Sequence, residues 1–374
     1  MGWSEMSYIV RVFDYREPVA STYLAPAMKA ASEISDAYFV RHWKQGPHWR
    51  IVLPDTPMRS IQAFTANLRE HLELVRVTGE RDEYRLSASN FSEDHQARLA
   101  ELESDQGPFL PLMSDAHVDM IRAPERTEMV GGSAGAKALE RFYVETTRSG
   151  LGVLEHLDHP AELRQFAFDL MIATVHAFSG VGLARGFVSF RSHSEAFLNW
   201  WPEGKGLREK WDRMSRKAAE TLDERAHQIV TQLDCGEALS PLVESWLSSS
   251  SGTFQDSAYQ ISAGRLSIDP PWSTASRNDA PFAVSASPFH AAEQTGTTLN
   301  IIWFSQYRLL LNYSYLQLTR LGIKPGERFL LCHLAADCAE RLFEVTASSK
   351  LLPGPGENAS VSRAIERFRT VYEL

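Results

Sequence analysis

The stretch NIIWFSQYRLLLNYSYLQLTRL, residues 300–321, decides the C-terminal part of the fold. It contains no proline or glycine, and Gly322 follows it as a helix C-cap. Most of its side chains are apolar, so we expect one helix that is buried around most of its circumference. Because polar groups in a buried helix need partners or a cavity, we expect its polar side chains to line a cavity. These side chains recur at steps of three and four residues and share one helical face: Ser305, Arg308, Asn312, Tyr315 and Thr319.

The overall composition is typical of a soluble globular protein. The chain has 374 residues, of which 44% are hydrophobic and 23% are charged, which suffices for a large core. Its formal net charge of −9 argues against a general nucleic-acid-binding protein. The three cysteines form no CxxC pair, as expected in a reducing cytoplasm. No segment resembles a signal peptide or is apolar enough to span a membrane, so we expect a cytoplasmic protein.

The N-terminal part predicts a mixture of strands and helices. Residues 8–15, YIVRVFDY, are rich in β-branched and aromatic side chains, as is typical of a strand. Residues 38–53, YFVRHWKQGPHWRIVL, hold two similar runs around the turn sequence KQGP, which predicts a β-hairpin. An amphipathic helix at residues 58–75 and a short strand at residues 83–86 complete the predicted α+β lobe.

The remainder of the chain has helical periodicity from residue 160 onward. Residues 248–298 are the exception, because they are rich in serine and proline and predict an irregular segment. We therefore predict an α+β fold, with an N-terminal mixed β/α lobe over residues 1–130 and a mainly helical lobe over residues 131–374. A single compact domain is the alternative.

The predicted hairpin offers a candidate site for anions. Side chains alternate along a strand, and we expect Arg41 in the first run and Arg50 in the second to point to the same side, with His48 beside them. Paired arginines suit carboxylates and phosphates. Spacing alone favours the simpler interpretation, a solvated basic face on an edge hairpin.

No motif predicts a metal or a cofactor. The histidines are scattered, without HExxH or a comparable ligand spacing. No GxSxG or Cys-His arrangement indicates a covalent nucleophile. His193 follows Arg191 between two serines, a place more typical of a structural histidine than of a catalyst.

Four separated passages together resemble the elimination domain of class I lanthipeptide dehydratases and its stand-alone thiopeptide relatives. FVRHWKQGPHWRIVL (39–53) resembles a signature of Arg-aromatic followed by Pro-His-aliphatic-Arg. APERTEMVGG (123–132) is similar to a glutamate-containing run that ends in Gly-Gly. FVSFRSHSEAFL (187–198) resembles a Ser-His helix start, and LNYSYLQLTRLGIKPGER (311–328) resembles an Asn-Arg-Leu-Gly stretch. Their order and spacing extend the resemblance over nearly the whole chain.

The last passage departs from the glutamate-eliminating members. Those members carry a histidine, thought to serve in elimination, where this chain has Tyr315, and Thr319 stands in place of their asparagine. Arg41 and Arg50 match the arginines that hold the glutamyl group in those members. Loss of the histidine on a retained scaffold implies similarity to thiopeptide pyridine synthases. These catalyse a formal aza-[4+2] cyclisation of two dehydroalanines in an azole-modified precursor peptide, with loss of water and of the leader peptide.

The resemblance implies a site on the predicted helix of residues 300–321. Positioned hydroxyl and amide groups donate to a carbonyl and move protons, while the site holds the two dehydroalanines together. The implied catalytic candidates are Tyr315 and Ser305, which we favour, and Tyr307, Tyr313 and Gln306. The implied residues for substrate or leader binding are Arg41, His48, Arg50, Arg308, Asn312 and His193. For each tyrosine, the alternative is a core ring whose hydroxyl is satisfied elsewhere.

The expected partner is the modified precursor peptide, with its leader and its azole- and dehydroalanine-bearing core, along with other enzymes of the same pathway. No cofactor, metal, nucleic acid or membrane is expected. Two alternatives stay open. In the first, the chain is a glutamate-elimination subunit of a split dehydratase, with His193 or His48 as the base. In the second, it is a non-catalytic module that binds the precursor peptide.

Overall fold

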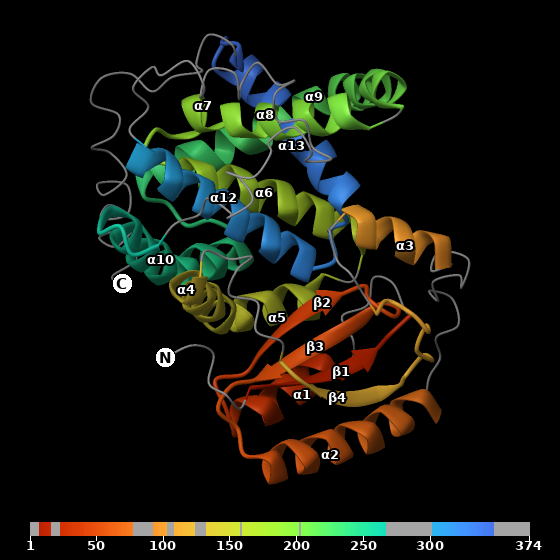
Figure 1. The fold of residues 1–374 in the computed structure, drawn as a ribbon. Coiled ribbons are helices and arrows are strands. Elements are labelled where there is room, and N and C mark those ends of the chain that lie inside the picture. The colour runs from red at the N-terminus through yellow and green to blue at the C-terminus, as the bar shows by residue number, and fades with distance from the viewer. Residues whose placement is uncertain are drawn as a thin grey trace. The chain divides into compact units, whose positions relative to one another are not determined.

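The computed structural model describes residues 7–15, 23–77, 93–102, 108–123, 132–157, 159–201, 203–266 and 301–347, and it confirms an α+β fold (Figure 1). The chain forms two compact units. The first unit consists of Met1–Thr127, Leu139–Glu162 and Arg320–Gly322, and the second of Glu128–Ala138, Leu163–Thr319 and Ile323–Leu374.

The first unit is built on a four-stranded antiparallel sheet in the order β2-β3-β1-β4. β1 (Tyr8–Phe13) lies between β3 (His48–Leu53) and β4 (Val118–Arg122), and β2 (Tyr38–His42) pairs with β3 at the edge. The predicted hairpin is therefore confirmed. The fourth strand is one that the sequence analysis missed, and the strand predicted at residues 83–86 lies outside the described residues.

Both faces of this sheet carry apolar side chains that account for its position in the core. Val10, Val12 and Ile51 share one face by their register and are completely buried. Helices α1 (Leu24–Ser32) and α2 (Met58–Val77) lie along one side of the sheet, as Figure 1 shows. The opposite face packs Ile9, Tyr38 and Val52 against the side chains of Tyr143 and Val144 in α4 (Gly132–Glu145). The remaining helices of this unit are α3 (Glu93–Leu102) and α5 (Thr147–His156).

The second unit is helical. Its elements are α6 (Pro160–Phe178), α7 (Leu183–Gly186), α8 (Val188–Trp200), α9 (Gly204–Cys235), α10 (Pro241–Ser262), α12 (Ile301–Arg320) and α13 (Pro325–Leu342). α13 packs on α8 and α9. α12 confirms the helix predicted over residues 300–321, and Gly322 follows it with the positive φ of +100° that favours glycine.

One segment that was predicted to be irregular is in fact helical. α10 continues through residues 248–262, and the rest of the predicted irregular segment, from residue 267, lies outside the described residues. The serine run fits a helix because its hydroxyls donate back to carbonyls one turn earlier, as Ser250 does to Trp246 at 2.8 Å. Phe254 and Leu247 are buried on the same helix and anchor it.

Within the described residues, no single helix has the length and apolar character of a membrane span. The bent pair Pro160–Phe178 and Leu183–Asn199 reaches that criterion only when the two helices are taken together, with a bend of 105°. The first of these helices is mostly buried, as is typical of a core helix.

Candidate active site

Tyr315 is at the centre of a polar cluster formed by three helices of the second unit. Its hydroxyl lies 2.8 Å from Nδ1 of His193 on α8 and 3.3 Å from Sγ of Cys332 on α13. The imidazole and phenol rings meet edge to face, with centroids 5.2 Å apart. Only 7% of Tyr315 is exposed, whereas His193 is half-buried. The structure therefore brings together two predicted site residues that are far apart in the sequence.

Burial sets the protonation of this cluster. It raises the pKa of the Tyr315 hydroxyl, and the neighbouring Cys332 raises it further. Burial also raises the pKa of the Cys332 thiol to about 11. Both groups are therefore protonated near neutral pH, so Tyr315 presents a neutral hydroxyl that donates or accepts a hydrogen bond with His193.

A cation lies over the same phenol ring. The guanidinium carbon of Arg328 is 5.0 Å from the ring centroid of Tyr315 and 5.0 Å from that of Phe329. Arg328 is in the first turn of α13, which begins at Pro325. The start of this helix is capped by Glu327, whose carboxylate accepts from the backbone N–H of Lys324 at 3.2 Å. The sequence analysis missed this arginine, because nothing in the spacing relates it to Tyr315.

The other predicted catalytic residues on α12 are separated from Tyr315. Ser305 is half-buried and lies ten residues earlier, which corresponds to about 15 Å along a helix, so the two side chains do not act on one bond. The Tyr307 hydroxyl donates to the carbonyl of Gly186, and burial raises its pKa. Tyr313 is buried and stacks on Phe254 with centroids 6.4 Å apart.

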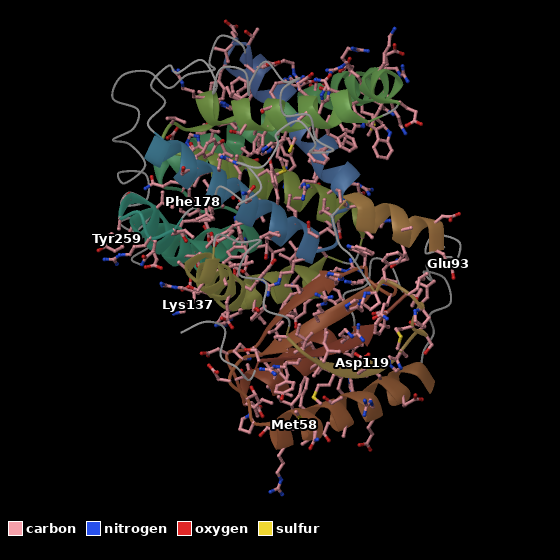
Figure 2. The ribbon with its side chains drawn as sticks, in the orientation of Figure 1. Met58, Glu93, Asp119, Lys137, Phe178 and Tyr259 are labelled. Atoms are coloured by element: carbon pink, nitrogen blue, oxygen red, sulfur yellow. The ribbon has the colours of Figure 1, made fainter. Side chains whose placement is uncertain are left out.

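A small hollow lies on another side of the same helix. It is lined by Phe178, which Figure 2 labels, together with Ser179, Phe254, Ala258, Gln306, Tyr307, Leu309 and Leu310. The amide nitrogen of Gln306 donates to the carbonyl of Ala258 and to the hydroxyl of Ser262, both at 3.0 Å. This hollow includes Gln306 and Tyr307 but not the predicted stripe. On the stripe itself, Asn312 is exposed and Arg308 is half-buried.

The prediction that Arg41 and Arg50 point to the same side is wrong. The register pairs Arg41 with Trp49 and Arg50 with Val40, and directly paired residues of antiparallel strands share a face. The two arginines therefore occupy opposite faces of the sheet and do not hold one anion together. Arg41 stacks on the Trp49 ring, with its guanidinium carbon 4.7 Å from the centroid.

His48 and Arg50 do lie together, as predicted. Nε of Arg50 donates to Nε2 of His48 at 3.1 Å, and Nδ1 of His48 lies 2.9 Å from the carbonyl oxygen of Gly46. Burial, and then the charge of Arg50, lower the pKa of His48 to about 3. This histidine is therefore neutral and bound to its neighbours, which does not suit it to serve as a general base.

Arg320 is another buried cation, in the first unit. It is 1% exposed and donates to the hydroxyls of Thr146 at 2.9 Å and Thr147 at 2.5 Å, and its guanidinium carbon is 4.0 Å from the Phe39 ring centroid. Burial lowers its pKa to about 9. The family pattern includes this arginine, and the structure gives it a packing role at the end of α12.

One cluster of the second unit has the ligand types of a metal site. The ligand atoms of Asp212, His333 and Asp337 lie within 4.8 Å of one another. Arg191, however, donates to Asp337 at 2.5 Å and to Glu340 at 2.7 Å, and it is 3.4 Å from Nδ1 of His333. A fixed guanidinium supplies the positive charge that a metal ion would bring, so we assign this cluster a structural role.

Comparison with known proteins places this fold in a family. Residues 10–339 match the family described as "Lantibiotic biosynthesis dehydratase C-term". A structure described as "Pyridine synthase, TbtD, from thiomuracin biosynthesis" is 30% identical, with a TM-score of 0.69 over 91% of this chain and 99% of that chain. The crystal structure of TsrL is 17% identical, with a TM-score of 0.65 over 94% of this chain and 99% of that one, a likeness of fold. No curated protein matches the chain. Since the family match spans most of the sequence, the chain belongs to the lantibiotic dehydratase C-terminal family.

Proposed function

We propose that this protein is a pyridine synthase of thiopeptide biosynthesis. It would join two dehydroalanines of an azole-modified precursor peptide in a formal [4+2] cyclisation, with loss of water and of the leader peptide. The observation that carries the proposal is the hydrogen bond between Tyr315 and His193, at the helix position where the eliminating relatives are thought to hold a histidine. The similarity to the pyridine synthase TbtD supports the same reading.

The pair suits the first chemical step, in which a peptide amide becomes its imidic-acid tautomer. The amide nitrogen must lose a proton and the carbonyl oxygen must gain one. Nε2 of His193 accepts the proton from nitrogen, Tyr315 donates its hydroxyl proton to oxygen, and Nδ1 of the imidazolium then returns a proton to the phenolate through the hydrogen bond. The phenol is restored and the imidazole is neutral again, with its proton moved from Nδ1 to Nε2, so the step consumes no net acid or base. Exchange of this proton with water resets the half-buried His193 for the next turnover.

The later steps require position more than further groups. The resulting azadiene closes onto the second dehydroalanine with two new carbon–carbon bonds, and loss of water and then of the leader as its carboxamide makes the ring aromatic. Holding the two dehydroalanines in contact supplies on the order of 7–11 kcal/mol of the barrier in favourable cases. The precursor peptide is the partner that this proposal requires, in concert with the enzymes that dehydrate and heterocyclise it.

Two parallel incubations separate this function from its two alternatives, and the products of both are read by mass spectrometry. In the first, the protein is mixed with a dehydrated, azole-bearing precursor, and a product that lacks one water and the leader supports pyridine formation. In the second, it is mixed with a glutamylated precursor, and release of glutamate indicates elimination, for which His193 is the available base. Binding without any change of mass indicates a carrier module.

The role of Tyr315 is tested by Tyr315→Phe, which keeps the buried ring and removes only the hydroxyl. We expect turnover to fall by about 10²- to 10⁴-fold, the usual range for a lost proton-transfer group, with little change in substrate affinity. Tyr143→Phe is the matched control, since Tyr143 is a partly buried tyrosine of the other unit that stacks on Tyr38. Unchanged turnover in Tyr315→Phe would make Tyr315 a core residue.

A further inference from the structure

We propose that Arg328 is a catalytic residue that binds the carbonyl oxygen of the reacting amide beside Tyr315 and His193. This inference rests on the proposed function and adds to it the group that stabilises negative charge. Its basis is the position of the guanidinium over the Tyr315 ring, with 5.0 Å between the guanidinium carbon and the ring centroid.

The guanidinium is held by rings and not by a carboxylate. In the described part of the chain, the side chain of Arg328 forms no ion pair or hydrogen bond, and its Nε atom is shielded from solvent. Other arginines of the same unit behave differently, since Arg191 and Arg208 each donate to carboxylates at 2.5 Å. The cation–π contacts with Tyr315 and Phe329 hold the guanidinium in place and leave its N–H donors for an acceptor on a substrate.

The position of Arg328 is not explained by the stability of α13. It is the fourth residue of a helix that begins at Pro325, where the positive end of the helix dipole disfavours a cation. Glu327, one residue earlier, is the favourable charge at this end and pairs with Arg164 at 3.2 Å. Arg328 is therefore unfavourable for its helix, and it has no carboxylate partner among the described residues. A bound ligand would explain its position better than helix stability does.

The reaction supplies a ligand of the right chemistry. When Tyr315 protonates the amide oxygen while the amide nitrogen loses its proton, electron density moves toward that oxygen. A fixed cation over the Tyr315 ring stabilises this charge more in the transition state than in the ground state. The positive charge of Arg328 already acts at this place, because it opposes the rise in the pKa of both Tyr315 and Cys332.

The test compares Arg328→Gln and Arg328→Lys with Arg164→Gln. The control removes the neighbouring arginine that pairs with Glu327 on the protein surface. The substrate is the dehydrated, azole-bearing precursor, and the readouts are kcat and KM by mass spectrometry, with melting temperatures to confirm folding. We expect Arg328→Gln to lower kcat by about 10²-fold with KM changed less than threefold. Arg328→Lys should recover part of the loss, and the control should match wild type.

The outcomes separate a failure of this inference from a failure of the proposed function. If wild type leaves the precursor unchanged, the proposed function fails, whatever the variants do. If wild type turns over and folded Arg328→Gln keeps its kcat, the inference is overturned. A rise in KM alone overturns it as well, because Arg328 would then hold the peptide and not the reacting oxygen.

Discussion

Acid should destabilise this protein through one histidine of the sheet. His48 is 3% exposed, its Nε2 accepts a hydrogen bond from Nε of Arg50 at 3.1 Å, and its Nδ1 lies 2.9 Å from the carbonyl oxygen of Gly46. Burial, followed by the charge of Arg50, lowers its pKa from 6.5 to about 3. Protonation of Nε2 would place its N–H against the N–H of Arg50, so the folded state resists the proton that the unfolded state accepts.

The direction and size of the effect follow from the two pKa values. Above pH 6.5, His48 is neutral in both states and its contribution to stability is complete. Below that pH the unfolded chain gains a proton that the folded chain does not, so the free energy of unfolding falls by about 1.4 kcal/mol per pH unit until the pH nears the folded pKa. Between pH 7 and pH 4.5 this residue alone should remove roughly 3 kcal/mol, against a typical total of about 5–15 kcal/mol.

Urea unfolding at pH 7 and at pH 4.5 measures this effect. The comparison uses wild type, His48→Gln and His156→Gln, the last of which changes an exposed histidine. The pH-dependent loss of stability should be smaller by roughly 3 kcal/mol in His48→Gln than in wild type, and unaltered in His156→Gln. Every other titrating group, including His333, is shared and cancels. An equal pH-dependent loss in wild type and His48→Gln would refute the reasoning.

Two further substitutions test the packing. Arg191→Leu should lower the free energy of unfolding by about 3–5 kcal/mol, because it leaves the carboxylate of Asp337 without its partner at 2.5 Å; a loss below about 1 kcal/mol in urea titration would contradict this. Gly322→Ala should lower the melting temperature, since φ is +100°, a backbone conformation that strains an L side chain, and the new Cβ would also displace the guanidinium of Arg41. Gly326→Ala meets no atom within 4 Å, so an equal shift in both alanine variants would argue against strain at Gly322.

Local patterns in the sequence were sufficient for the fold class. The hairpin at residues 38–53 and the helix at residues 300–321 were predicted correctly, because turn residues, β-branched runs and apolar periodicity act over a few neighbouring residues. Such patterns failed where hydrogen bonds of the side chains change the usual conformational preference of a residue type. The serine run in α10 is helical because its hydroxyls find acceptors in the same helix, and composition does not reveal this.

The sequence by itself therefore determined the hairpin at residues 38–53 and the helix at residues 300–321 and, through the family pattern, it singled out Tyr315 as a candidate. Only the tertiary structure decided what this tyrosine touches. His193 is 122 residues away in the chain and contacts Tyr315 because α8 packs near α12, while Arg328 contacts the same ring from α13. Periodicity assigns a residue to a face of its own helix but does not say which helix covers that face. In the sheet, likewise, the register of β2 on β3 placed Arg41 and Arg50 on opposite sides, because strand register depends on the whole connection between the strands.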